Sequence, residues 1–182
     1  MTYIEEIANT RLRQPNTMVA GISSKILQIR KESIKQSLSD FNNQGHRQEY
    51  IATINGVMYY DDARAENVNA TWFTFENIVR PVIWIAGGDD LHADFKELRR
   101  MAGKKVKSLI CIGAVKADMS KVFGKEVKDI FMADSLEDAI KMAALLAKHD
   151  DIVIFSPACK SASADYDERG QLFIETVKQL EQ

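Results

Sequence analysis

The run Pro81-Val82-Ile83-Trp84-Ile85-Ala86-Gly87-Gly88-Asp89-Asp90 (residues 81–90) decides the fold, because it sets an unbroken apolar segment between a proline and a glycine pair. A short apolar run bounded by turn-forming residues is typical of a β-strand buried on both faces. Strands of this kind belong mostly to parallel sheets. The run therefore predicts a central strand over residues 82–86.

The same pattern recurs downstream, and helical patterns separate its copies. Apolar runs cover residues 108–112, 127–132 and 151–155. Helical periodicity covers 67–78, 93–102, 117–123, 135–148 and a terminal stretch from about 167, with expected inner residues Val68, Trp72, Phe75, Ile78, Phe173, Val177 and Leu180. Strands that alternate with helices predict an α/β fold with a mainly parallel sheet covered by helices on both faces.

One hairpin precedes this alternation. Residues 49–54 and 57–60 are rich in β-formers, and Asn55-Gly56 separates them. Asn-Gly favours a two-residue hairpin turn, because both turn positions need positive φ. The hairpin should add one antiparallel strand, which gives a sheet of about six strands.

The first 44 residues differ in character. Val19, Ile22, Ile26 and Ile29 recur at helical spacing within residues 16–30, and a second helix is expected over 32–41. The polar stretch 42–45 then indicates a linker. We expect a boundary that divides the chain into residues 1–44 and 45–182.

Composition excludes several classes of protein. The formal net charge of −2 offers no sign of capture by nucleic acid or by an acidic membrane. Apolar runs fall short of the ~18 residues of a membrane span, and the amino terminus lacks the features of a secretory signal. Cys111 and Cys159 form no metal spacing with the histidines, so we expect no metal ligands and a reduced, cytoplasmic protein.

Polar and small residues follow the predicted strands. They are Asp61-Asp62, Gly87 to Asp90, Gly113, and Ser156 to Ser161. Ligands of open α/β sheets bind beyond the carboxyl ends of the strands, so these loops could form one polar site. The alternative is equally open: glycine and aspartate commonly do no more than end strands. Asp61-Asp62 could bind a cation or ribose hydroxyls, or could be a solvated turn.

Phosphate-binding signatures are weak. Gly87-Gly88 lacks the GxGxxG context, and no GxxxxGK[ST] loop is present. His46-Arg47 could contact a phosphate or be an ordinary surface pair. Trp72, Phe73 and Phe75 are expected to be helix core rather than a stacking platform.

Five ordered blocks of sequence carry a family resemblance. They are Asn16 to Ala20, His46 to Glu49, Gly56-Val57 with Asp61 to Asn67, Ile85 to Gly88 with Asp94-Phe95, and Ser156 to Ser161 with Glu168-Arg169-Gly170. Together they resemble the Mur-type amino-acid ligases, in particular the members that add D-glutamate. The SPACxS block with the nearby ExRG is the most diagnostic.

The resemblance implies a Rossmann-like carboxy-terminal domain over residues 45–182 and the tail of a central ATPase domain over 1–44. The implied reaction uses ATP and Mg to phosphorylate the carboxylate of UDP-N-acetylmuramoyl-L-alanine, and the amine of D-glutamate then attacks the acyl phosphate. It belongs to peptidoglycan synthesis for the cell wall. The phosphate loop, the ATPase domain and the UDP-binding domain are missing from these residues, so we expect no ligation by this chain alone.

The resemblance also implies roles for single residues. Asn16 falls at an adenine contact, Arg47 at the nucleotide phosphates and Asp62 at the ribose. Ser161 and Tyr166 fall at the incoming glutamate. Arg64 stands at the substrate carboxylates, where the family has lysine. No catalytic residue is expected within the chain.

Other positions depart from the family pattern. The family's NDSKATN is DDARAEN here, so Glu66 replaces a threonine, and Leu91 replaces a lysine after the glycine pair. Losing a cation and gaining a carboxylate both oppose binding of a dicarboxylate. The alternative hypothesis is a diverged, stand-alone module that binds a nucleotide or a partner protein without chemistry, and a third is a structural remnant without ligand.

Overall fold

A computed structural model describes residues 45–76, 78–162 and 164–181. The helices expected over 16–30 and 32–41, and Asn16 with them, lie outside the described residues. Within the described range, the fold class expected from the sequence is confirmed.

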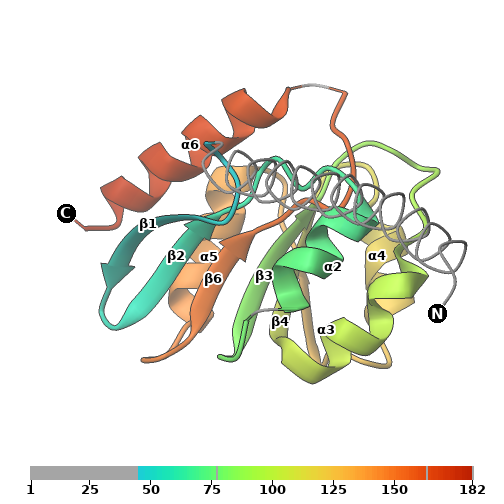
Figure 1. Ribbon diagram of the computed structural model, residues 1–182, viewed down its shortest axis with the longest axis horizontal. Helices are drawn as coiled ribbons and strands as arrows, with labels where there is room; N and C mark the ends of the chain where they lie inside the picture. Colours follow the sequence, from blue (N-terminus) through green and yellow to red (C-terminus); the bar gives the residue numbers. More distant parts are fainter. Residues whose placement is uncertain (1–44, 77, 163, 182) are drawn as a thin grey trace, which may run out of the picture. The chain divides into compact units, whose positions relative to one another are not determined.

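The sheet has six strands in the order β1-β2-β6-β3-β4-β5 (Figure 1). Their bounds are β1 Glu49–Ile54, β2 Val57–Asp61, β3 Val82–Gly87, β4 Val106–Ile112, β5 Asp129–Met132 and β6 Ile152–Phe155. All neighbouring pairs are parallel except β1 and β2, which are antiparallel. After β5, at one edge of the sheet, the chain returns to the middle, where β6 lies between β2 and β3. The last strand in the sequence, β6, is therefore the parallel neighbour of β2, the first of the parallel strands.

The predicted hairpin is confirmed at its turn. Asn55 and Gly56 have φ values of 52° and 79°, as this turn requires. Because β1 runs against β2, Glu49 at the start of β1 pairs with Asp61 at the end of β2. The residues just before β1 therefore lie beside the carboxyl ends of the parallel strands.

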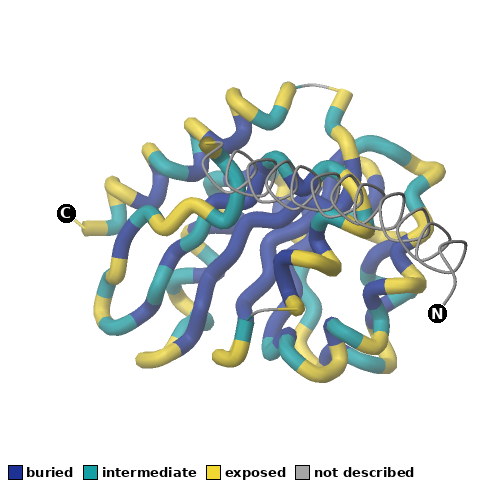
Figure 2. The backbone as a smooth tube through the Cα atoms, viewed as in Figure 1, coloured by how far each residue is buried: buried dark blue, intermediate teal, exposed yellow. Residues whose placement is uncertain are grey.

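Helices cover both faces of the sheet (Figure 1). Their bounds are α2 Val68–Glu76, the 3-10 helix η1 Phe95–Leu98, α3 Arg99–Lys105, α4 Lys116–Phe123, α5 Leu136–Leu146 and α6 Tyr166–Gln179. One core contains Trp84 with Phe75 of α2 and Phe123 of α4, and the other contains Ile83 and Ile85 with residues of α5 and α6. Alternate residues of β3 thus enter opposite cores, as its continuous apolar run predicts, and the strands in the middle of the sheet are buried along their length (Figure 2).

Two sequence predictions on the helices were wrong in detail. Trp72 is 40% exposed rather than part of the inner stripe of its helix, and Phe73 is exposed to the same extent. Leu180 caps α6 and packs half-buried against the core, as expected. The helix expected over 93–102 is the 3-10 turn η1 followed by α3, because Asp94 caps a tight turn through its side chain.

Trp84 is predicted to be a large source of stability. Its indole Nε1 donates a hydrogen bond to the Ser156 carbonyl at 2.7 Å, and its ring packs edge-on against Phe75 and Phe123. Trp84→Phe removes that donor and leaves a cavity, so urea denaturation should show a loss of about 2–4 kcal/mol. The matched change Trp72→Phe should stay within about 0.5 kcal/mol, and equal losses in both variants would contradict this account.

Candidate site at the carboxyl ends of the strands

The loops that leave the parallel strands meet at one edge of the sheet, as expected from the sequence. Backbone hydrogen bonds join Asp62 N to Phe155 O at 2.9 Å, Gly87 N to Pro157 O at 3.0 Å and Val115 N to Gly88 O at 3.2 Å. The loops after β2, β3, β4 and β6 are thereby fixed to one another.

The glycines of this edge serve contacts between the loops. A Cβ atom added at Gly88 would lie 2.4 Å from the carbonyl oxygen of Lys160, and one at Gly113 would lie 2.4 Å from that of Gly88. Gly113 also has a φ of 72°, which other residues rarely adopt. The space next to these two glycines is thus filled by neighbouring backbone.

Asp62 is a buried carboxylate that joins three segments. It is 1% exposed. Its Oδ2 accepts hydrogen bonds from Thr74 Oγ1 at 2.7 Å and Ser156 Oγ at 2.8 Å, and its Oδ1 accepts from Gln48 N at 3.2 Å. Burial raises its pKa to about 6, against the opposing effect of these hydrogen bonds. The solvated-turn alternative for Asp61-Asp62 was wrong, and the ribose contact of Asp62 stays a prediction.

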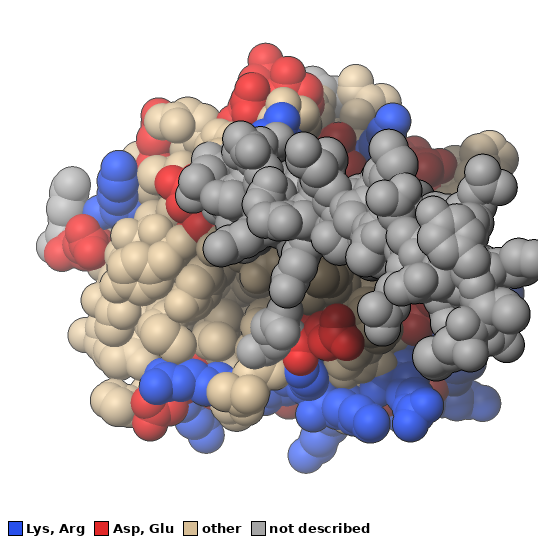
Figure 3. Space-filling model, viewed as in Figure 1, with Lys and Arg blue, Asp and Glu red and all other residues tan. Residues whose placement is uncertain are grey.

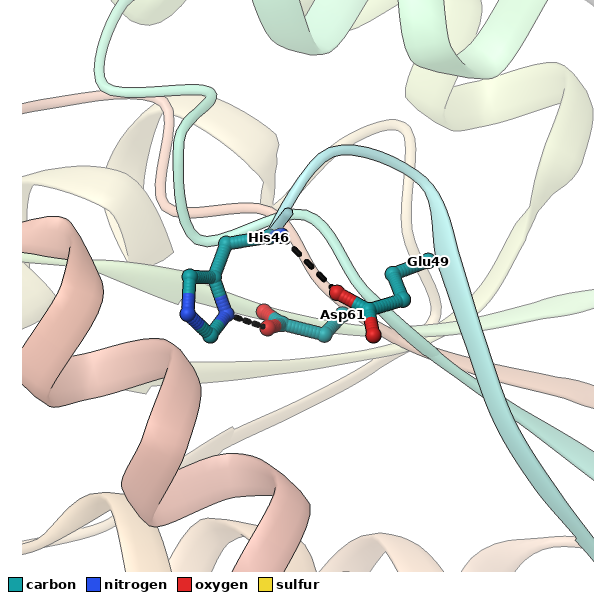
Figure 4. Close-up of side chains that lie close together, drawn as sticks. All are labelled: His46, Glu49 and Asp61. Carbon is teal, nitrogen blue, oxygen red and sulfur yellow. Dashed lines mark hydrogen bonds and ion pairs between the residues drawn. The ribbon is translucent and has the colours of Figure 1, made fainter. Parts of the chain in front are cut away.

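His46 and Asp61 form a close pair next to Asp62 (Figure 4). His46 Nδ1 lies 2.5 Å from Asp61 Oδ2, and the backbone N of His46 donates to Glu49 Oε2 at 2.9 Å. Asp61 is fully buried, which raises its pKa, while the hydrogen bond with His46 acts in the opposite direction. In the part of the chain described, these three side chains are the one group whose ligand atoms lie close enough together for a metal ion, within 4.8 Å of one another. The atoms that would bind the ion already interact within the group.

Arg47 is half-buried and close enough to Asp62 and Arg64 to feel their charges. Burial lowers the pKa of its guanidinium, Asp62 raises it, and Arg64 lowers it. Asp62 and Arg64 therefore change the pKa of Arg47 in opposite directions. Its role at a nucleotide phosphate stays a prediction.

Arg64 and Tyr166 come together from distant parts of the sequence. Arg64 Nη2 donates a hydrogen bond to the Tyr166 hydroxyl at 2.7 Å, and its guanidinium carbon lies 4.3 Å from the centre of the ring. Tyr166 is the first residue of α6. Two of the residues predicted to bind the amino-acid substrate are thus in direct contact.

Ser161 binds Asp89, a residue of the candidate site whose pairing with Ser161 the sequence did not predict. Ser161 Oγ donates to Asp89 Oδ2 at 2.7 Å, and Ala162 N donates to the same oxygen at 2.9 Å. The hydrogen bond from Ser161 is the largest of the effects that lower the pKa of Asp89. Leu91, two residues further on, is 65% exposed.

Arg169 is a residue to which the sequence analysis gave no role. It is 7% exposed, and its Nη2 donates to the Gly87 carbonyl at 2.5 Å. Its guanidinium carbon lies 5.0 Å from the centre of the Phe155 ring. Arg169 therefore ties α6 to the ends of β3 and β6. The position of Arg169 in the ExRG block could have pointed to a role for this residue. The sequence alone, however, does not show that its side chain is buried.

Cations also gather at the opposite ends of the strands. Figure 3 shows Lys and Arg side chains along that lower edge, and a hollow of about 530 Å³ there is lined by Arg80, Lys104, Lys105 and Lys107 among others. Most of these cations have internal partners. Lys107 binds Asp151, Arg80 binds Asp150, and Lys105 donates to the Ile78 carbonyl and to the last carbonyls of α2.

The geometry defines an α/β domain in which Arg47, Arg64 and a buried acidic pair lie at the carboxyl ends of the parallel strands. Residues 46–159 match the family model described as Mur ligase, glutamate ligase domain, and the chain belongs to this family. In the described residues, no helix is long and apolar enough to cross a membrane.

Curated relatives agree with this membership. The chain is 36% identical over 167 residues to the UDP-N-acetylmuramoylalanine–D-glutamate ligase of Christiangramia forsetii, covering 91% of this chain and 38% of that protein. It is 34% identical over 167 residues to the ligase of the same name from Salinibacter ruber, covering 91% of this chain and 36% of that protein. The chain thus spans little more than a third of the length of these relatives.

Asp62 is predicted to make the stability of the fold fall as the pH rises. Its pKa is about 6 in the folded chain, above the 3.8 of an ordinary aspartate, so the folded chain binds more protons than the unfolded chain between these values. The free energy of unfolding should therefore decrease from about pH 4 to about pH 6, by about 3 kcal/mol from this residue. Urea denaturation of Asp62→Asn should show a smaller slope with pH, whereas Asp118→Asn, at an exposed position, should keep the wild-type slope. An unchanged slope in Asp62→Asn would show that the carboxylate does not titrate as described.

Gly170→Ala is predicted to destabilise the chain, although alanine usually stabilises a helix by about 1 kcal/mol over glycine. The added Cβ would lie 2.1 Å from His46 Nδ1 and 2.7 Å from Asp61 Oδ2. We expect a loss of about 1–3 kcal/mol in thermal or urea denaturation. The same change in a His46→Ala background should cost less, because the ring is gone. A gain in stability in the wild-type background would mean that His46 does not pack against α6.

Proposed function

We propose that this chain is the carboxy-terminal, amino-acid-binding part of an ATP-dependent amide ligase that adds D-glutamate to UDP-N-acetylmuramoyl-L-alanine in peptidoglycan synthesis. Residues 1–44 would be the tail of its central ATPase domain, and the cytoplasm its location. The observation that carries the proposal is the meeting of the strand-end loops, which puts Arg47, Arg64 with Tyr166, and the Ser161 loop on one edge. Family membership and the names of the relatives support it.

The chain's own residues fit the binding and orientation of anions. Arg47 would face the nucleotide phosphates, and a cation there would balance charge at the transferred phosphoryl group. The hydrogen bond to Tyr166 fixes the Arg64 guanidinium, so this side chain would lose little further conformational entropy when it binds a carboxylate. ATP, when bound with Mg, supplies activation of the substrate carboxylate. The phosphate loop for it would come from the domains that these residues do not include.

A diverged module without chemistry is the second candidate, and two observations favour it. The Ser161 hydroxyl is donated to a carboxylate, Asp89, rather than turned to an incoming acid. Leu91 presents an apolar side chain where the resemblance implies a lysine. Such a module would bind a nucleotide or a partner protein without forming an amide.

A chimaera separates the two candidates. The corresponding carboxy-terminal part of the Christiangramia forsetii ligase would be replaced by this chain, and ADP release would be measured with UDP-N-acetylmuramoyl-L-alanine and with or without D-glutamate. We expect ADP release that depends on D-glutamate, and none from the 182-residue chain alone. Arg47→Ala in the chimaera should lower the turnover about a hundredfold.

The unmodified relative is the positive control, and the melting temperature of the chimaera shows that it is folded. A folded chimaera that binds ADP but makes no amide would favour the diverged module. ADP release without D-glutamate would point to loss of coupling rather than to amide formation. Amide formation by the isolated chain would contradict the proposed division of labour between domains.

A further inference from the structure

The backbone on either side of Arg47 has an unusual conformation. His46 has a φ of 62° and Gln48 a φ of 45°. Residues other than glycine rarely adopt this left-handed region, and they keep it only where surrounding contacts hold it. Arg47 therefore stands between two residues whose conformation is imposed by their neighbours.

The hydrogen bonds of His46 come from the start of β1, from the end of β2 and from the loop after β2, and its ring also lies against α6. Its ring Nδ1 lies 2.5 Å from Asp61 Oδ2, and its backbone N donates to Glu49 Oε2 at 2.9 Å. Its carbonyl accepts a hydrogen bond from Arg64 N at 3.1 Å. The donor, the acceptor and the side chain of this residue are all engaged.

The other side of Arg47 is held by the second acidic residue. Gln48 N donates to Asp62 Oδ1 at 3.2 Å, and Gln48 Nε2 lies 3.5 Å from Thr74 Oγ1. Asp62 is itself fixed by Thr74 and Ser156, which hold its Oδ2. His46 is thus bonded to Asp61, the last residue of β2, and Gln48 is bonded to Asp62, the residue that follows it.

We propose that Asp61 and Asp62 are positioning residues for Arg47, acting through His46 and Gln48 respectively. This rests on the proposed function, in which Arg47 faces the phosphates of a nucleotide. The two carboxylates are at most 1% exposed, and donors from the protein already occupy them. Both carboxylates can therefore hold the residues that flank Arg47, and this role leaves the ribose contact predicted for Asp62 open. An arginine whose conformation is already fixed loses less conformational entropy when it binds an anion, and this increases its affinity.

The test is a double-mutant cycle read by calorimetry with ADP as the ligand of the full chain. His46→Ala and Asp61→Ala should each raise the dissociation constant about tenfold, the scale of one charge-assisted hydrogen bond. Arg47→Ala should raise it at least as much. The double variant His46→Ala with Arg47→Ala should bind no more weakly than Arg47→Ala alone, because His46 acts through Arg47. If the losses of binding free energy in His46→Ala and Arg47→Ala add up in the double variant, the proposal is overturned.

Conservative and matched variants distinguish positioning from general damage. Asp61→Asn can still bond the His46 ring in its other tautomer, so it should recover most of the affinity lost in Asp61→Ala. His149→Ala removes an exposed histidine between α5 and β6 and should leave ADP binding unchanged. Failure of Asp61→Asn to recover affinity in a chain that melts like the wild type would count against the proposal.

A spectroscopic arm separates failure of this proposal from failure of the proposed function. If the wild-type chain does not bind ADP, the nucleotide role of Arg47 fails, and the positioning claim is then decided by NMR without ligand. Asp61→Ala should change the backbone couplings of residues 46–48 and the side-chain Nε–H signal of Arg47, whereas His149→Ala should change neither. Wild-type signals in Asp61→Ala would overturn the proposal whatever the result with ADP.

Discussion

The burial of the Asp62 carboxylate between β2, β6 and α2 is the interaction on which the candidate site depends. A buried carboxylate must be hydrogen-bonded, and Asp62 takes donors from three segments that are distant in sequence. Its bonds fix the loop before β1, the side of α2 and the start of the Ser156 loop relative to one another. The same burial raises the pKa of Asp62, because its charged form loses contact with water. The hydrogen bonds to Asp62 therefore hold the site together against the cost of burying a carboxylate.

Much of the fold could be predicted from the sequence because its signals are local. The apolar run of β3 and the Asn55-Gly56 turn each act over a few residues, and each is found as expected. Trp72 was misplaced, since periodicity gives the face of a helix but not the extent of its cover. The site was only partly predictable. The meeting of the loops follows from parallel strands, but the burial of Asp62, the pairing of Ser161 with Asp89 and the burial of Arg169 depend on tertiary contacts.

The family match covers the fold of the domain, whereas the contacts of single residues decide which ligands the site could bind. The family match covers residues 46–159, and the same residues form the sheet, α2 and the helices up to the Ser156 loop. Arg47 and the Arg64–Tyr166 contact suit an anion-binding edge. Leu91 and the bond between Ser161 and Asp89 lie instead where the resemblance implied contact with the amino-acid substrate.

The central claim is that ligands bind at the carboxyl ends of the strands, and mapping of ADP onto the chain by amide NMR shifts tests it most directly. The account predicts that the largest changes fall at residues 46–48, at Asp62 to Arg64 and in the loop after Gly87. Changes centred instead on Arg80, Lys104 and Lys107, in the basic hollow at the other edge of the sheet, would contradict it.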